Sequence, residues 1–65
     1  MRDIRLVWLN QRQLRRVASL VGVTTRELTK GCTGRYAGNL LGDARATMDP
    51  AYRRRLIQSI KEVVE

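Results

Sequence analysis

The side chains in this sequence that could do chemistry are mostly cations. Eleven arginines and two lysines stand against six carboxylates, so the chain of 65 residues carries a formal net charge of +7 at pH 7. An excess of charge indicates which partners a protein attracts rather than how it folds. The partner that this excess favours is a polyanion.

Residues suited to catalysis or metal binding are scarce. The chain has no histidine and one cysteine, so neither a serine–histidine triad nor a cluster of histidine and cysteine ligands can form within it. We therefore expect no enzymatic activity, no metal, no cofactor and no small-molecule substrate. Cys32 has no second cysteine to pair with, which favours the reducing cytoplasm, and we interpret it as a small buried apolar residue.

Length and hydropathy narrow the class of protein further. A chain this short forms one domain, here residues 1–65, and buries only about 60% of the surface that its unfolded form exposes. The longest apolar run, LVWL at 6–9, is far shorter than the roughly 18 residues of a membrane span. With no signal-peptide pattern visible, we expect a soluble cytoplasmic protein with no membrane partner.

The end of the chain predicts a helix over residues 50–64. Asp49 can cap its N-terminus, and Pro50 suits the first helical position because its missing N–H is not needed there. Apolar residues then recur at three- and four-residue spacing. They are Tyr52, Leu56, Ile57, Ile60, Val63 and Val64.

A second amphipathic helix is predicted over NQRQLRRVASLVG, residues 10–22, ending at Gly22. Asn10 and Gln13 could form a capping box that begins this helix afresh, or the helix could run unbroken from about Asp3. The preceding IRLVWL is also rich enough in β-forming residues for a short strand. We favour a helix there, with Trp8 as a core anchor.

Two shorter helices are predicted between these. TTRE at 24–27 fits a capping box, so a short helix should follow and end near Gly31. The next helix would begin around Thr33 or Gly34 and end at Gly42. Four or five short helices predict an all-α fold, a compact bundle.

Adjacent short helices in a strongly basic domain suggest a helix-turn-helix, whose second helix lies in the major groove of DNA. Two registers compete. In the first, Ala18, Gly22, Val23 and Leu28 form the pattern and residues 24–31 are the recognition helix. In the second, 24–31 supports a recognition helix at 33–42, which we favour because Leu28 is a weak single anchor.

Angular spacing gives the second candidate helix an inside and an outside. At 100° per residue, one arc holds Tyr36, Ala37, Leu40 and Leu41, and the opposite arc holds Arg35, Gly38, Asn39 and Gly42. We interpret the first arc, including Tyr36, as core. Glycine in mid-helix costs about 0.5–1 kcal/mol relative to alanine, and a close approach of DNA would account for Gly38.

GCTGRYAGNLLGDARATMDPAYRRRLI, residues 31–57, resembles the second half of a lambda-repressor-like (Cro/Xre-type) DNA-binding domain. The residues that carry the resemblance are Gly31, Cys32 and Thr33 in the turn, Tyr36, Asn39, Leu40 and Leu41 in the helix, and Arg45, Asp49, Arg53 and Arg54 beyond it. The resemblance implies a small phage or prophage repressor that binds double-stranded DNA and occludes a promoter.

We expect Asn39 and Arg35 to read base edges, because asparagine matches adenine and arginine matches guanine. Arg45, just beyond the helix, should contact phosphate. The residues expected at DNA are Thr33, Arg35, Tyr36, Gly38, Asn39 and Arg45, with Thr25, Arg26 and Lys30 from the first register.

We also expect a homodimer on a two-fold operator, with half-sites about 10 base pairs apart. Ile60, Val63 and Val64 would form the contact. The alternative is a protein-interaction module, such as an antitoxin or phage inhibitor, that binds an acidic protein surface. RNA binding is disfavoured because the chain has only three aromatic residues for stacking.

Overall fold

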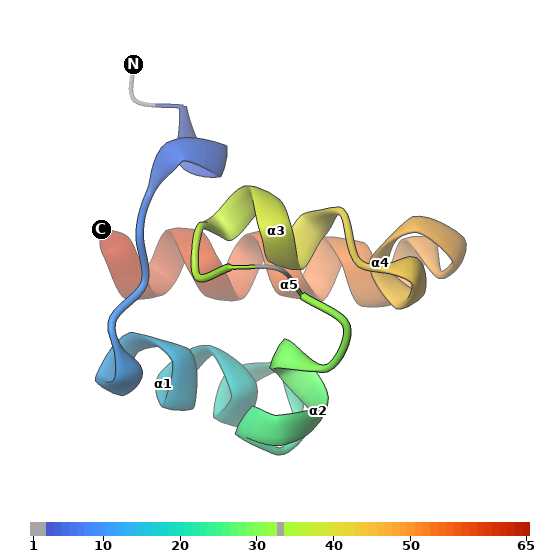
Figure 1. Cartoon of the computed structure of the whole chain (residues 1–65), viewed down its shortest axis with the longest axis horizontal. Helices are drawn as coiled ribbons and strands as arrows, with labels where there is room; N and C mark the ends of the chain where they lie inside the picture. Colours follow the sequence, from blue (N-terminus) through green and yellow to red (C-terminus); the bar gives the residue numbers. More distant parts are fainter. Residues whose placement is uncertain (1–2, 33) are drawn as a thin grey trace.

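Five α-helices and one 3₁₀ turn make up the part of the chain that the computed structural model describes, residues 3–32 and 34–65. In chain order they are η1 (Ile4–Leu6), α1 (Gln11–Val21), α2 (Thr25–Thr29), α3 (Ala37–Leu41), α4 (Ala44–Met48) and α5 (Pro50–Val64). The long α5 runs behind α3 and α4, and α1 and α2 form a second layer below it (Figure 1). This arrangement confirms the predicted all-α bundle.

The helix α5 carries the centre of the core and matches its prediction. The Asp49 carboxylate accepts the backbone N–H groups of Ala51 and Tyr52 at 3.1 and 3.2 Å, so the helix begins where the sequence indicated. Tyr52, Leu56 and Ile60 are fully buried, and α5 packs against α1, α3 and α4. One helix therefore holds both layers together.

The helix α1 begins afresh at Gln11. The Asn10 side chain accepts the Gln13 N–H at 2.8 Å, and the Gln13 side chain accepts the Asn10 N–H at 2.9 Å. The helix ends at Gly22, whose φ of +92° lies in the left-handed region that favours glycine. The alternative of a helix running unbroken from Asp3 is therefore wrong.

The segment before α1 differs from the favoured prediction of a helix. After η1 the chain is extended, and it pairs with a distant segment through Leu9 N–H to Arg35 O at 3.0 Å and Ala37 N–H to Val7 O at 2.9 Å. Successive side chains of an extended chain point to opposite sides. Leu9 is consequently buried and Trp8 is 52% exposed, so the prediction of Trp8 as a core anchor is wrong.

The same pairing shortens α3. Tyr36 is held in extended conformation opposite Trp8, so the helix begins at Ala37 rather than at Thr33 or Gly34. Tyr36 is 50% exposed, which corrects its assignment to the core, whereas Ala37, Leu40 and Leu41 are buried as predicted. The helix ends at Gly42, also as predicted.

Gly38 does not lie on an open outward face of α3, as the angular spacing suggested. A Cβ on Gly38 would lie 3.0 Å from the Arg5 carbonyl oxygen and 3.2 Å from the Arg5 Cβ, because η1 packs there. The close approach that requires a glycine comes from the chain's own N-terminal turn. The glycine is therefore explained without DNA, and the expected use of Gly38 at DNA stays a prediction.

Candidate nucleic-acid interface

A tight turn joins α1 to α2. Residues 22–24 form it, and the N–H groups of Gly22 and Val23 both donate to the Ala18 carbonyl, at 2.9 and 3.0 Å. The Thr24 hydroxyl then accepts the Glu27 N–H at 3.1 Å and caps α2. Both Ala18 and Leu28 are buried, and α1 packs against α2. The two helices and their turn therefore lie where the first register expects them.

In the favoured second register, α2 and α3 are not joined by a short turn. Residues 30–36 separate α2 from α3, and Lys30 and Tyr36 have extended backbone conformations. The helix α3 packs against η1, α4 and α5. Leu28 is a firmer anchor than its isolation in the sequence suggested, because it is only 1% exposed and the Gly22 turn also supports α2.

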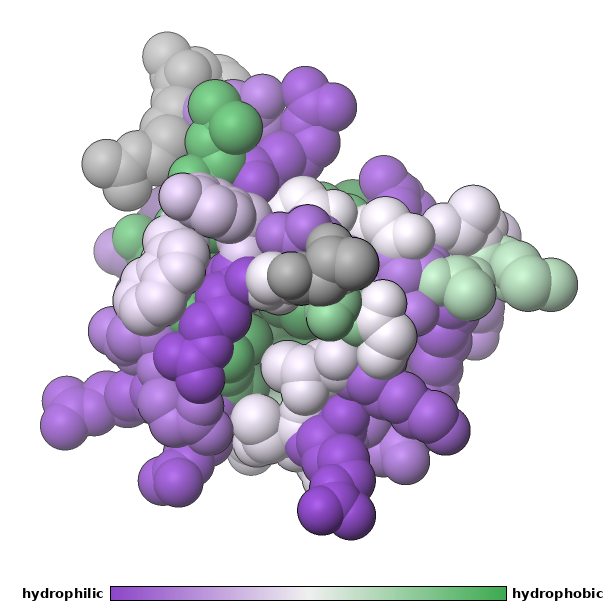
Figure 2. Space-filling view, in the orientation of Figure 1, coloured by the Kyte–Doolittle hydropathy of each residue, from purple (hydrophilic) through white to green (hydrophobic). Residues whose placement is uncertain are grey.

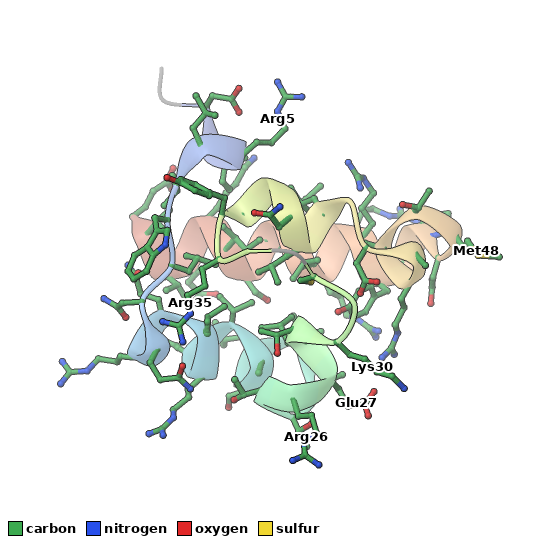
Figure 3. The ribbon with its side chains drawn as sticks, viewed as in Figure 1. Arg5, Arg26, Glu27, Lys30, Arg35 and Met48 are labelled. Carbon is green, nitrogen blue, oxygen red and sulfur yellow. The ribbon has the colours of Figure 1, made fainter. Side chains whose placement is uncertain are left out.

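A groove of about 640 Å³ lies beside this helix pair. Its lining comes from the start of α1, one face of α2 and the segment before α3: Gln11, Leu14, Thr25, Arg26, Thr29, Cys32, Gly34 and Arg35. Figure 2 shows an apolar floor between strongly hydrophilic side chains. Figure 3 shows Arg35 beside α1, with Arg26 and Lys30 projecting outward from α2. The groove therefore has a cationic rim.

Arg35 is held at this rim by two contacts. Its guanidinium donates to the Gln11 side-chain oxygen at 2.6 Å and lies 5.7 Å from the centroid of the Trp8 ring. Gln11 is a site residue that the sequence analysis missed. The signal that could have found it is its place at the first position of α1, next to a strong cap.

Asn39, expected to read adenine, is half-buried. Its side-chain oxygen accepts the Tyr36 N–H at 3.2 Å and so helps to cap α3. A bidentate contact to adenine uses both the oxygen and the nitrogen of the amide. The expected contact of Asn39 with adenine would require this capping bond to open or to be shared.

The remaining predicted DNA contacts are dispersed. Thr25 and Arg26 line the groove, and Lys30 is exposed at the end of α2. Arg45 lies on α4, with its guanidinium 4.3 Å from the centroid of the buried Tyr52 ring, so it covers the core. Thr33 lies outside the described residues.

The residues expected to form a dimer contact are largely used by the core. Ile60 is fully buried, so its expected place in an interface is wrong. Val63 and Val64 are partly buried against the same core. The chain end packs on its own domain because α5 lies along α1 and carries its apolar face inward.

Cys32 is a half-buried thiol in the groove lining. Its Sγ lies 3.6 Å from the Leu28 carbonyl oxygen. Burial raises the pKa of the thiol, and the nearby Asp43 carboxylate raises it further. The thiol therefore stays protonated at neutral pH, which suits packing rather than nucleophilic chemistry.

Arg5, by contrast with the groove arginines, has a carboxylate partner. Its guanidinium lies 3.0 Å from the Asp3 carboxylate, and this hydrogen bond lowers the pKa of Asp3. Both side chains are exposed, so the pair adds little to stability. Its consequence is that Arg5 offers less positive charge to a ligand than the rim arginines do.

Comparisons with known proteins found no match. No protein-family model, curated protein or solved structure is similar to this chain at a significant level. The groove and the charge around it are therefore the features that bear on function.

Two further findings on residues 3–32 and 34–65 bear on the class of site. No group of three or more histidine, cysteine, aspartate or glutamate side chains there could hold a metal ion. Within the same residues, none of the helices has both the length and the apolar character needed to cross a membrane.

Proposed function

We propose that this protein binds double-stranded DNA in a sequence-specific manner, with α2 as the recognition helix. The observation that carries the proposal is the α1–α2 pair: a short helix fixed by a tight turn, with Thr25, Arg26 and Thr29 facing a groove that Arg35 borders. Such a pair is the docking element of helix-turn-helix proteins, and the major groove of B-DNA, about 12 Å wide, admits one α-helix.

Each groove residue suits a part of the duplex. An arginine can donate two hydrogen bonds to the O6 and N7 atoms of guanine, which makes Arg26 the proposed base reader. Lys30, at the end of α2, and Arg35, across the groove, are proposed to contact phosphates on either side. The hydroxyls of Thr25 and Thr29 can bind a base edge or a phosphate.

The net positive charge of the chain also supports double-stranded DNA as the partner. The net charge of +7 includes the exposed side chains of Arg12, Arg15 and Arg16 on α1, next to α2. Cations that neutralise phosphates release counterions, and this release supplies most of the affinity that is independent of sequence. The base contacts of α2 would add the specificity.

We propose further that binding represses transcription by occupying a promoter in the cytoplasm of a bacterial host, as the resemblance to Cro-type phage or prophage repressors suggests. One short recognition helix makes few base contacts, so specific affinity needs a larger interface. Two copies on half-sites about 10 base pairs apart would supply it. Sedimentation with and without the selected duplex measures that stoichiometry.

The test begins with selection of bound sequences from a random duplex library, followed by titration of the selected duplex at several salt concentrations. Affinity should fall by about 0.9 log units per log unit of salt for each phosphate neutralised. Arg26→Ala should lose discrimination at one base pair, whereas Arg54→Ala, which removes an exposed arginine from α5, should keep it.

Two results would contradict the proposal. If no duplex is enriched and binding is insensitive to salt, the acidic protein surface becomes the favoured partner. If Arg26→Ala keeps the wild-type site preference, α2 is not the recognition helix.

A further inference from the structure

Two of the three aromatic side chains of this protein lie side by side on its surface. Trp8 and Tyr36 face each other across an antiparallel bridge, flanked by the hydrogen bonds Leu9 N–H to Arg35 O and Ala37 N–H to Val7 O. Trp8 and Tyr36 are therefore a non-hydrogen-bonded pair. Of the two kinds of antiparallel pair, this is the one whose side chains lie closer together, and both lie on the same face. They are 52% and 50% exposed.

The exposure of this pair is not what folding requires. A domain of this size needs its large apolar residues in the core, and the third aromatic, Tyr52, is there with 1% of its surface exposed. The bridge instead turns Leu9 and Ala37 inward and both aromatic rings outward. A contiguous exposed aromatic surface of this kind marks a binding site more often than a lone apolar residue does.

The guanidinium of Arg35, next to the two aromatic rings, indicates what kind of ligand this surface favours. Arg35 lies 5.7 Å from the Trp8 ring centroid, near the outer limit of a cation–π contact, and donates one hydrogen bond to Gln11. A guanidinium has five N–H donors, so the others can bind an anion. A nucleotide offers a flat π-face for the rings and a phosphate for the guanidinium in one unit.

Other occupants fit less well. A second copy of the chain would bring another Arg35 and another +7 of charge to the contact. An acidic protein surface would satisfy Arg35 but would bring carboxylates rather than π-faces to the rings. The rings are also unsuited to the interior of a duplex, where bases are already stacked on one another.

We propose that Trp8 and Tyr36 form a stacking platform for the unpaired bases of single-stranded DNA, with Arg35 paired to the adjoining phosphate. The platform is distinct from α2, which is proposed to read the duplex. The choice of DNA rather than RNA rests on the proposed function, because Arg35 also lines the groove assigned to duplex DNA.

Trp8 is the only tryptophan of the chain, so its fluorescence reports directly on the platform. The probe is oligo-dT of about ten nucleotides, within the length that single-strand binding domains cover. Stacking of a base on the indole should quench the fluorescence in a saturable titration. An absence of quenching at oligonucleotide concentrations that saturate binding measured by anisotropy would overturn the platform, as would an absence of any binding.

Substitutions at Tyr36 separate the contribution of base stacking to oligo-dT binding from that of side-chain volume. Tyr36→Ala should weaken oligo-dT binding about 5- to 150-fold, and Tyr36→Leu, which keeps an apolar side chain without a π-face, should weaken it similarly. Tyr36→Phe should retain the wild-type affinity. Met48→Ala is the control, because Met48 is 83% exposed and lies at the far end of α4, well away from Arg35 (Figure 3).

The Tyr36 variants remain informative if one of them is destabilised. Circular dichroism checks the fold of each, and Leu and Phe at position 36 preserve apolar bulk if Ala does not fold. Wild-type affinity in a folded Tyr36→Leu protein would overturn the proposal. Binding of oligo-rU as tight as that of oligo-dT would overturn the assignment to DNA.

Parallel titrations with the selected duplex keep the two proposals apart. Duplex binding without quenching by oligo-dT would refute the platform and leave the proposed function standing. Quenching by oligo-dT that depends on Tyr36, without salt-dependent duplex binding, would refute the proposed function and support the platform.

Discussion

The two candidate surfaces of this protein meet at Arg35 but differ in chemistry. The α2 surface presents hydroxyls and cations on a helix, whereas the Trp8–Tyr36 surface presents two π-faces on paired extended segments. The α2 surface suits base edges and phosphates, and the aromatic surface suits exposed base faces. The two proposals together would give one small domain two modes of recognition, because a helix and an extended segment share one edge.

The two regions are also built differently, and this difference can be tested first at Leu28. Leu28→Ala should lower the free energy of unfolding by about 2–5 kcal/mol, because this single buried side chain anchors α2 to α1. Leu20→Ala is the matched control: Leu20 is 44% exposed, so the same truncation should cost much less. Urea unfolding measures both, and equal losses would mean that α2 is not anchored in this way.

Selection experiments with Arg26→Ala and Asn39→Ala compare the two registers at DNA. We expect Arg26→Ala to lose about 1–3 kcal/mol of discrimination at one base pair. Asn39→Ala should leave the site preference unchanged, because the Asn39 oxygen accepts a backbone N–H within its own turn. The reverse result would restore α3 as the recognition helix, which the sequence analysis favoured.

Alanine substitutions at Gly22 and Gly38 separate the effect of backbone strain from the effect of close packing. Gly22→Ala should cost about 1–2 kcal/mol, because an alanine at a φ of +92° is strained even with open space around it. Gly38→Ala has a normal φ but meets the Arg5 backbone at 3.0 Å, so it should release η1 while α3 gains helix propensity.

Trypsin cleavage after Arg5 measures the release of η1, and urea unfolding measures the global stability. We expect faster cleavage for Gly38→Ala and a lower stability for Gly22→Ala. Unchanged cleavage in Gly38→Ala would show that η1 tolerates the added methyl group in place.

The smallest expected effects concern individual cations at the duplex. Lys30→Ala and Arg35→Ala should each make the salt slope of duplex binding shallower by nearly one unit, as the loss of one phosphate contact does. Arg45→Ala should leave the slope unchanged and lower the unfolding free energy by about 0.5–1 kcal/mol, because Arg45 lies over the Tyr52 ring. A shallower slope for Arg45→Ala would instead support the phosphate contact expected from the resemblance.

The sequence alone determined the elements whose signals are local. The caps at Asn10, Thr24 and Asp49, and the stop at Gly22, each act through hydrogen bonds between residues at most four apart. Three of them occur as predicted, and the cap at Asn10 is one of the two alternatives that the sequence left open. The buried faces of α1 and α5 follow from helical periodicity for the same reason. The positive charge is likewise a property of composition.

The tertiary structure decided everything that depends on pairing between distant segments. The bridge joins residues 7–9 to residues 35–37, and no local spacing reveals which segment an extended chain will pair with. That pairing turns Trp8 and Tyr36 outward, delays the start of α3 and brings Arg5 against Gly38. The groove also needs α1, α2 and the segment before α3 to meet. This meeting depends on the packing of α2 against α1 and on the pairing of residues 35–37 with residues 7–9, so no single stretch of sequence determines it.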